Sequence, residues 1–381
     1  MRDLDWGSPW RQRSWTFTRV ESPPSAALRA GFGSGSSSPY CQVLPVLMND
    51  STAVLVGDIG ATNTRLTLVR GVPDSTPVLH EAVFASRDYT GLEEPVRKFL
   101  RDAPAPAQRA VFAVAGPVVE GRAELTNLGW VLEEEALRES LDLASVRLLN
   151  DLVAMAYAIP HLGPESLLTL QEGRPVPGGA RAVVAPGTGL GHAFLTWDGT
   201  AYRAHPSEGG HVDFAPVGQL QDELLHHLRR RYGHVCCERV CSGRALPDLY
   251  AFLQERGTAS ESEGFAERLA GARDHTPVIV EAALGMPPSA RCLATVELFA
   301  AILAAEAGNV ALRVLATGGV YLGGGLPRRL LPVLTRAAFL DPFRQKGRLS
   351  PLLSRIPLHV VIRPNVGLLG ALRCVVAGHA D

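Results

Sequence analysis

A short segment rich in glycine and threonine combines residue types that could bind phosphate. It reads Gly57-Asp-Ile-Gly-Ala-Thr-Asn-Thr-Arg65, and apolar, strand-like runs lie on both sides of it. Glycine permits the backbone angles and the close approach with which a turn aims N–H groups at a phosphate, and the Asp58 carboxylate suits a hydrated magnesium ion. The segment therefore predicts a nucleotide-phosphate loop on a β-hairpin. The candidate contacts are Gly57, Asp58, Gly60, Ala61, Thr62 and Asn63.

A second glycine loop, Gly187-Thr-Gly-Leu-Gly191, repeats this pattern. A strand-like segment follows it, whereas a dinucleotide-binding fold needs a helix after its glycines. The better interpretation is a hairpin turn that faces phosphate through Gly187, Thr188 and Gly189. An ordinary glycine-rich hairpin would explain this loop equally well if it stood alone, but the partner loop at 57–65 favours phosphate binding.

A third glycine cluster, Thr317-Gly-Gly-Val-Tyr-Leu-Gly-Gly-Gly325, follows a predicted strand at 314–317. Its glycines would allow the backbone to approach a flat ligand such as adenosine. Gly318 and Gly319 are therefore candidate nucleotide contacts. The alternative is a flexible surface loop, which the apolar flanks of the cluster disfavour.

The pair Asn150-Asp151 stands where a predicted strand at 146–149 meets a predicted helix. A carboxylate at such a position can cap the helix or act as a general base. Transfer of a phosphoryl group to a hydroxyl needs an acceptor for the hydroxyl proton, and Asp commonly serves. From the residues alone the capping role is the commoner of the two.

The segment Ser207-Glu-Gly-Gly-His-Val-Asp-Phe214 places Glu208, His211 and Asp213 around a Gly-Gly turn. A metal site would want more ligands at the right spacing, and a catalytic histidine would want a nucleophile. Binding of a polyol fits, because carboxylate and imidazole groups pair with neighbouring hydroxyls. Glu238 could add another acceptor, although a surface or helix-start position would also explain it.

Composition excludes several classes of function. The chain has 381 residues, 46% of them hydrophobic, with a net charge of −1, so we expect two packed domains and neither a nucleic-acid nor a membrane partner. We find no apolar stretch of transmembrane length. Lys98 and Lys346 are the only lysines, and neither lies in a Walker A or a protein-kinase pattern. The six cysteines show no paired framework, which favours a reduced cytosolic setting.

The elements that must position these residues follow an α/β pattern that occurs twice. We expect strand–turn–strand–strand units from 53 to 85 and from 181 to 205, each followed by helices, and this repetition predicts two related α/β domains facing each other across a cleft. Further strands are expected at 110–115, 146–149, 314–317 and 358–362. Helices are expected at 91–101, 132–141, 152–159, 219–232, 244–255, 291–310, 326–339 and 366–377. Residues 1–47 are rich in Pro, Gly and Ser, and we interpret them as a disordered extension before Met48.

Taken in order, these motifs resemble the bacterial glucokinase family over about residues 50–375. The matching segments are 57–65, 149–151, 187–191, 208–216, 233–243 and 318–320, and the block Glu208-Gly-Gly-His-Val-Asp-Phe-Ala-Pro216 is the most specific. The family belongs to the actin/hexokinase/Hsp70 ATPase superfamily. The resemblance implies an α/β, two-domain actin-like ATPase (ribonuclease H-like) fold with the active site in the interdomain cleft. It implies a small N-terminal domain at 48–161, completed by about 356–381, and a large C-terminal domain at 162–355.

The resemblance also implies an activity and roles for residues. The activity is transfer of the γ-phosphoryl group of ATP to the 6-hydroxyl of D-glucose, with Mg²⁺, by a cytoplasmic homodimer. Asp151 would be the base that takes the hydroxyl proton, and Asp58 would position Mg²⁺ through water. The sugar ligands would be Asn150, Asp151, Glu208, His211 and Glu238, and Asn127 would lie near the sugar.

Other readings stay open at this point. A sugar-sensing regulator without catalysis could share the fold, but residues 1–47 do not suit the helix-turn-helix that such regulators carry. A chaperone-type ATPase would need a further substrate-binding domain. The cysteine motif of the repressor/kinase (ROK) group is missing, so we expect no structural zinc. Glucose, mannose and glucosamine differ at one carbon, and both ATP and polyphosphate are open as phosphoryl donors.

Overall fold

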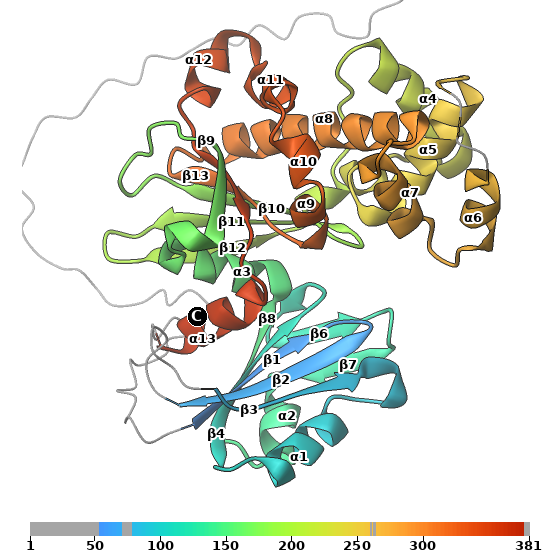
Figure 1. Ribbon diagram of the computed structural model, residues 1–381. Coiled ribbons are helices and arrows are strands. Elements are labelled where there is room, and N and C mark those ends of the chain that lie inside the picture. Colours follow the sequence, from blue (N-terminus) through green and yellow to red (C-terminus); the bar gives the residue numbers. More distant parts are fainter. Residues whose placement is uncertain (1–52, 71–77, 260, 262–263, 377–381) are drawn as a thin grey trace, which may run out of the picture. The chain divides into compact units, whose positions relative to one another are not determined.

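Two β-sheets with a repeated strand order organise the chain (Figure 1). The computed structural model describes residues 53–70, 78–259, 261 and 264–376, so the predicted extension at 1–47 lies outside the described residues. In each sheet a central strand pairs antiparallel with the strand that follows it and parallel with a later strand. The predicted repetition of the α/β pattern is confirmed.

The first sheet has the order β3-β2-β1-β4-β8. Its strands are β1 (Ala53–Ile59), β2 (Asn63–Arg70), β3 (Val78–Ala85), β4 (Ala107–Val114) and β8 (Ser145–Asn150). Helices α1 (Glu93–Asp102) and α2 (Glu134–Ser140) cover one face, where Phe99 and Leu137 pack against Leu55 and Phe112. The alternating residues Val54, Val56 and Val111 point to the other face, which therefore needs a different cover.

A small sheet between β4 and α2 was not predicted. It consists of β5 (Val118–Val119), β6 (Arg122–Leu125) and β7 (Trp130–Glu133). We expected a helix from 132 to 141, but the helix begins at Glu134 because Trp130 to Glu133 pair with β6. The turn of this sheet leaves Asn127 exposed.

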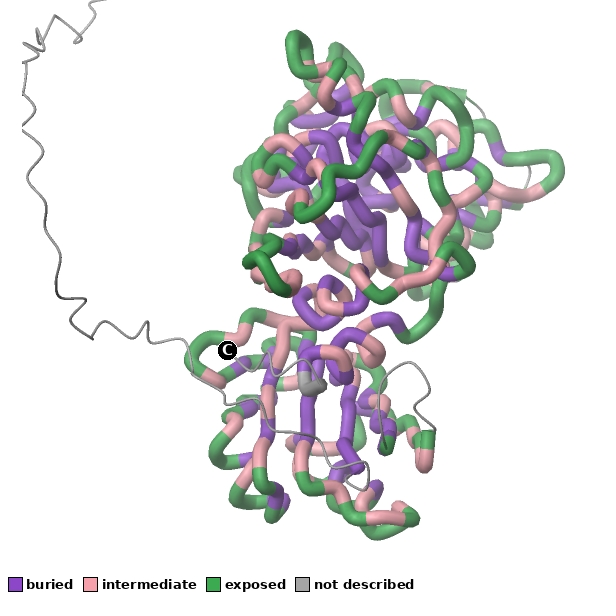
Figure 2. The backbone as a smooth tube through the Cα atoms, turned by 90° about the vertical axis from the view of Figure 1, so that its left-hand side faces the viewer, coloured by how far each residue is buried: buried purple, intermediate pink, exposed green. Residues whose placement is uncertain are grey.

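The second sheet has the order β12-β11-β10-β13-β14-β9. Its strands are β9 (Leu167–Gln171), β10 (Arg181–Pro186), β11 (Leu190–Trp197), β12 (Tyr202–Ser207), β13 (Gly319–Leu322) and β14 (Leu358–Val361). One face carries the largest apolar core, which includes residues from α4 (Gln219–Tyr232), α5 (Leu246–Glu255), α6 (Phe265–Gly271), α7 (His275–Leu284) and α8 (Ala290–Arg313). Figure 2 shows the buried residues concentrated along the strands and the helices that cover them.

The prediction that the chain has no apolar stretch of transmembrane length is wrong for helix α8. Within the described residues it alone is long and apolar enough to cross a membrane by length and composition, and 72% of its most apolar stretch is buried inside the protein. It packs against β10 and β13. Burial in the core of the second sheet therefore accounts for its apolar character.

Two helices pack on the remaining face of the first sheet (Figure 1). Helix α3 (Asp151–Ala158) contacts strands of both sheets, with Ala154 beside Val56 and Ala156 beside Val183. Helix α13 (Val366–Val376) crosses α3 where Gly370 meets the carbonyl of Ala154, so closely that a larger residue would not fit. The predicted return of the last helix to the N-terminal part of the chain is confirmed.

The segment after α8 differs from the prediction. The strand expected at 314–317 is wrong, because α8 continues to Arg313 and the chain turns through Leu315, with φ of +48°, before β13 begins at Gly319. The helix expected at 326–339 is divided because Pro332 cannot donate the helical hydrogen bond. The segments that replace and follow it are α9 (Gly325–Arg329), α10 (Leu331–Leu334), α11 (Leu340–Arg344) and α12 (Ser350–Leu353).

Candidate active site

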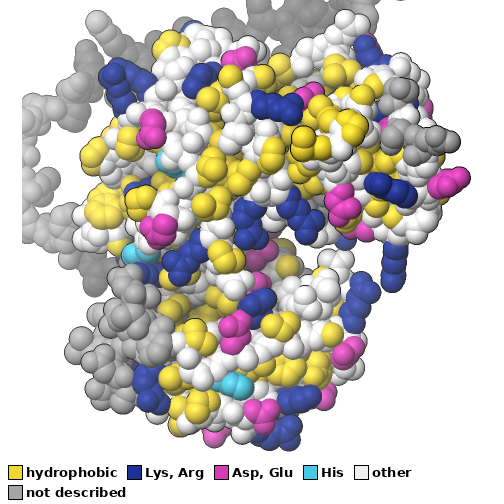
Figure 3. Space-filling model, in the orientation of Figure 1, with side chains coloured by type: hydrophobic (Ala, Val, Ile, Leu, Met, Phe, Trp, Pro, Cys, Tyr) yellow, Lys and Arg dark blue, Asp and Glu magenta, His cyan; other side chains and the backbone are white. Residues whose placement is uncertain are grey.

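Two cavities meet at the carboxyl ends of the parallel strands, where open α/β sheets commonly bind ligands. The smaller, of about 310 Å³, is lined by ends of both sheets, among them Asp58 of β1, Asp151 after β8 and Gly187 after β10. The larger, of about 900 Å³, lies on the side of the second sheet. Figure 3 shows basic and acidic side chains together near the middle of one face. Gly187, Gly325 and Arg328 line both cavities.

The carboxylate of Asp151 is free to act in the smaller cavity because Asn150 caps α3. The Asn150 side-chain oxygen accepts hydrogen bonds from the N–H groups of Leu152 at 2.9 Å and Val153 at 3.2 Å, and its amide donates to the carbonyl of Gly116 at 3.0 Å. Asp151 accepts one bond, from Leu152 N–H at 2.9 Å. The sequence left two roles open for the Asp151 carboxylate and favoured the cap; that interpretation is wrong, because the cap of α3 is Asn150.

The electrostatics around Asp151 suit a proton acceptor. Burial raises the pKa of Asp151 to about 6, and the nearby carboxylates of Asp58 and Glu208 add to this rise while the Leu152 N–H opposes it. A carboxylate with a raised pKa is a stronger base than an exposed one and is still mostly ionised at neutral pH.

The first glycine loop is a braced hairpin. Gly60 N–H donates to the carbonyl of Asn63 at 3.0 Å, and Ser86, from outside the hairpin, donates its hydroxyl to the carbonyl of Gly60 at 2.7 Å. Thr62 and Asn63 are exposed at the tip, and Ala61 is partly exposed. Gly57 has another role, because it is buried and a Cβ there would lie 2.6 Å from Phe112 Cδ1.

Asp58 is the residue of this hairpin that reaches the smaller cavity. In the register of β1 and β2 it lies opposite Arg65, whose guanidinium donates to Glu81 at 2.8 Å. Burial raises the pKa of Asp58, and the Arg65 charge opposes the rise. In the described ranges no group of three or more His, Cys, Asp or Glu side chains is arranged to hold a metal ion. The donor set therefore fits Mg²⁺ only as an ion that keeps most of its waters and shares phosphate oxygens, as Mg²⁺ commonly does.

The second glycine loop is tied to Glu238. The N–H of Leu190 donates to Glu238 Oε2 at 2.9 Å, and Gly189 lies so close to this carboxylate that a side chain there would collide. Gly187 accepts a hydrogen bond from Gly243 N–H at 2.8 Å. Thr188 lines the larger cavity. Glu238 and the loop are therefore positioned as one unit.

Glu208 and His211 lie beside this unit, although neither lines either cavity. Both side chains are more than half exposed, and Glu208 Oε2 is 4.0 Å from His211 Nε2. Gly210, between them, packs against the carbonyl of Leu190, and the Glu208 charge reaches Asp151. Asp213 instead pairs with the exposed His234, at 2.7 Å.

Gly318 and Gly319 are not at the cavities. They stand at the start of β13, where Gly318 packs against the backbone of Gly179 and Ala180. The glycines that line the cavities, Gly324 and Gly325, follow the other end of this strand. The misplaced strand at 314–317 caused this error, because it made the wrong glycines the ones that follow the strand.

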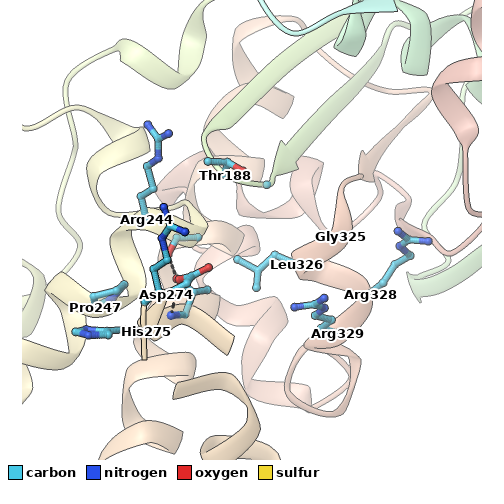
Figure 4. A pocket seen from close by; sticks show the side chains of 13 residues that line it. Thr188, Arg244, Pro247, Asp274, His275, Gly325, Leu326, Arg328 and Arg329 are labelled. Carbon is cyan, nitrogen blue, oxygen red and sulfur yellow. Dashed lines mark hydrogen bonds between the residues drawn. The ribbon is translucent and has the colours of Figure 1, made fainter. Parts of the chain in front are cut away.

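The larger cavity is strongly cationic (Figure 4). Four arginines line it, with Asp274 as the acidic residue, and Pro247 and Leu326 add apolar surface. The arginines are Arg244, Arg273, Arg328 and Arg329. Sequence reasoning missed all four, because they come from three separate segments and no spacing connects them. The glycines before Arg328 were the one signal that could have drawn attention to it.

Comparisons with known proteins agree with this site. The model of the Glucokinase family matches residues 55–377. The glucokinase of Nostoc sp. is 40% identical over 339 residues, covering 85% of this chain and 98% of that protein. The glucokinase of Caulobacter vibrioides is 37% identical over 321 residues, covering 83% and 93%.

Among solved structures, the crystal structure of a glucokinase from an Antarctic psychrotroph is 31% identical. It has a TM-score of 0.72 and covers 86% of this chain and 99% of that chain. The predicted two-domain actin-like ATPase fold is thereby confirmed. The motifs, the paired cavities and these matches together show that the chain belongs to the glucokinase family.

Proposed function

We propose that this protein is an ATP-dependent glucokinase that transfers the γ-phosphoryl group of ATP to the 6-hydroxyl of D-glucose. The observation that carries this proposal is the junction of the two cavities, where Asp58, Asp151 and Gly187 line a space that adjoins the larger, cationic one. The nucleoside of ATP takes the larger cavity. Its terminal phosphate then reaches the smaller one, next to Asp151.

The chemical step follows from this arrangement. The glucose 6-hydroxyl oxygen attacks the γ-phosphorus, its proton passes to the Asp151 carboxylate, and the bond from the γ-phosphorus to the bridging oxygen breaks, leaving ADP. Asp151 must be ionised to accept the proton, and its pKa of about 6 allows this at neutral pH. Mg²⁺, held through water by Asp58, would neutralise charge on the phosphates when bound.

The sugar is held by residues around the second glycine loop. Glu238 is fixed to Leu190 N–H, and Glu208 and His211 lie on the turn that packs against the same strand. Their carboxylates and imidazole accept from or donate to sugar hydroxyls, and Asn150 contributes from the start of α3. We extend the proposal to the domain limits at 48–161 and 162–355, and to a cytoplasmic homodimer.

A coupled assay over a panel of hexoses tests this function. Purified protein with Mg-ATP should phosphorylate glucose with a kcat/KM at least tenfold above those for mannose and glucosamine. A preference for another hexose would reassign the substrate. Tight glucose binding without ADP formation would indicate a sugar sensor, and ATP consumption that ignores sugar would refute the kinase.

A further inference from the structure

One charged side chain, that of Arg328, lines both cavities in the part of the chain that the structure describes. The other residues common to both are Gly187 and Gly325, which offer only backbone. The guanidinium group is exposed, and no described residue forms a hydrogen bond or ion pair with it. This contrasts with surface arginines such as Arg65, which donates to Glu81 at 2.8 Å.

The fold holds Arg328 at the junction through a tight turn. Gly324 has φ of +85°, and a Cβ there would lie 2.7 Å from the carbonyl oxygen of Pro186. The turn therefore brings α9 against the end of β10, just before the second glycine loop. Leu326 and Pro327 are buried and anchor α9, so Arg328 follows at the exposed side of this helix. Figure 4 shows it among the residues that line the larger cavity.

We propose that Arg328 is a catalytic residue that binds the β- and γ-phosphates of the donor during transfer. This rests on the proposed function. If the nucleoside lies in the larger cavity and the acceptor lies beside Asp151 in the smaller one, the phosphate chain must pass the residues that line both. Among these, Arg328 supplies the positive charge.

The positive charge of Arg328 would stabilise the leaving group, ADP. As the bond from the γ-phosphorus to the bridging oxygen breaks, negative charge grows on the β-phosphate oxygens. A guanidinium group donates two parallel hydrogen bonds to phosphate and keeps its charge at every relevant pH. Its contribution increases as this charge develops, so its loss should affect kcat as well as donor binding.

Three variants test the proposal. Arg328→Gln removes the charge, Arg328→Lys keeps it without the planar fork, and Arg348→Gln is the matched control. Arg348 is exposed, lines neither cavity and forms no hydrogen bond or ion pair with a described residue. For each protein we would measure kcat, both KM values, the thermal midpoint, and inhibition by inorganic tripolyphosphate, an anion that lacks the nucleoside.

Arg328→Gln should lower kcat by about 10²–10³-fold, the effect of losing one donor that stabilises a transition state. It should weaken tripolyphosphate inhibition about tenfold or more and leave the KM for glucose within about twofold, and Arg328→Lys should recover part of kcat. Arg348→Gln should match the wild type. Arg329→Gln, which alters only the larger cavity, should raise the KM for ATP more than it lowers kcat.

Two outcomes would overturn the inference. The first is a kcat and a tripolyphosphate inhibition of Arg328→Gln within about threefold of the wild type, in an enzyme that phosphorylates glucose. The second is an equal loss in Arg329→Gln, which would assign the effect to the general charge of the larger cavity. A wild type that does not phosphorylate glucose would refute the proposed function instead. Calorimetric binding of tripolyphosphate to wild type and Arg328→Gln would then still decide whether Arg328 binds phosphate.

Discussion

Replacing Asp151 with Asn should lower kcat and raise the free energy of unfolding. Asn keeps the oxygen that accepts from Leu152 N–H but cannot take a proton from a hydroxyl. Loss of a positioned general base typically lowers rates by about 10²–10⁴-fold, so kcat should fall by that factor. The affinity for glucose should stay within about threefold, because Asn150 and Glu238 keep their places.

The stability change can be worked from the pKa. The rise of the Asp151 pKa from 3.8 to about 6 means that ionising this carboxylate in the folded protein costs about 3 kcal/mol more than in the unfolded chain. Below pH 4 the carboxyl group is protonated in both states and this cost is absent. The free energy of unfolding of the wild type therefore falls as the pH rises from below 4 through 6. Asp151→Asn avoids the cost, so at pH 7.5 it should be more stable than wild type by up to about 3 kcal/mol.

The assay combines urea unfolding of both proteins at several pH values with steady-state kinetics. The difference in unfolding free energy should grow between pH 4 and 6 and level off above pH 7. In the wild type, kcat/KM should fall as the pH drops below about 6, because protonation removes the base. A variant with near-normal turnover, or a stability difference that does not change with pH, would refute the reasoning about Asp151.

Two further substitutions test the supporting roles. Asn150→Ala should reduce the unfolding free energy by about 1 kcal/mol, because it removes the cap of α3. Asn150→Ser should recover most of that loss in the same urea titration. Equal stabilities of the wild type and both variants would contradict the capping role of Asn150. Asp58→Asn should raise the Mg²⁺ concentration for half-maximal velocity about tenfold or more while glucose binding is unchanged, and an unaltered Mg²⁺ requirement would remove Asp58 from the metal site.

The helices and strands that end at glycine or threonine residues were predictable from the sequence. The two hairpins were visible because apolar runs end abruptly in glycine and threonine, and α4 was placed at 219–232 because glycines bound a regular apolar pattern. The small sheet was missed because strands of two to four residues, such as β5 and β6, carry little periodicity. The run at 314–317 looked like a strand, but its residues suit a turn after a helix equally well.

The candidate site was predictable where the residue type and its local sequence were sufficient to indicate a chemical role. Asp58, Asp151 and Glu238 are carboxylates beside turns; the structure brings Asp58 and Asp151 to the smaller cavity and joins Glu238 to the second glycine loop. Only the hydrogen bonds around α3 could show that Asn150 caps the helix and leaves Asp151 as the candidate base. The position of Arg328 depends on how β10 and β13 end side by side, which is a long-range relation that no local pattern encodes.

The proposed glucokinase activity is tested most directly by a stoichiometry measurement on the purified wild type with Mg-ATP and glucose. ADP and glucose 6-phosphate are followed together, with and without sugar. We expect equal amounts of the two products and almost no ADP when glucose is left out. ADP release that does not depend on glucose, or bound glucose that is never phosphorylated, would contradict the proposed activity.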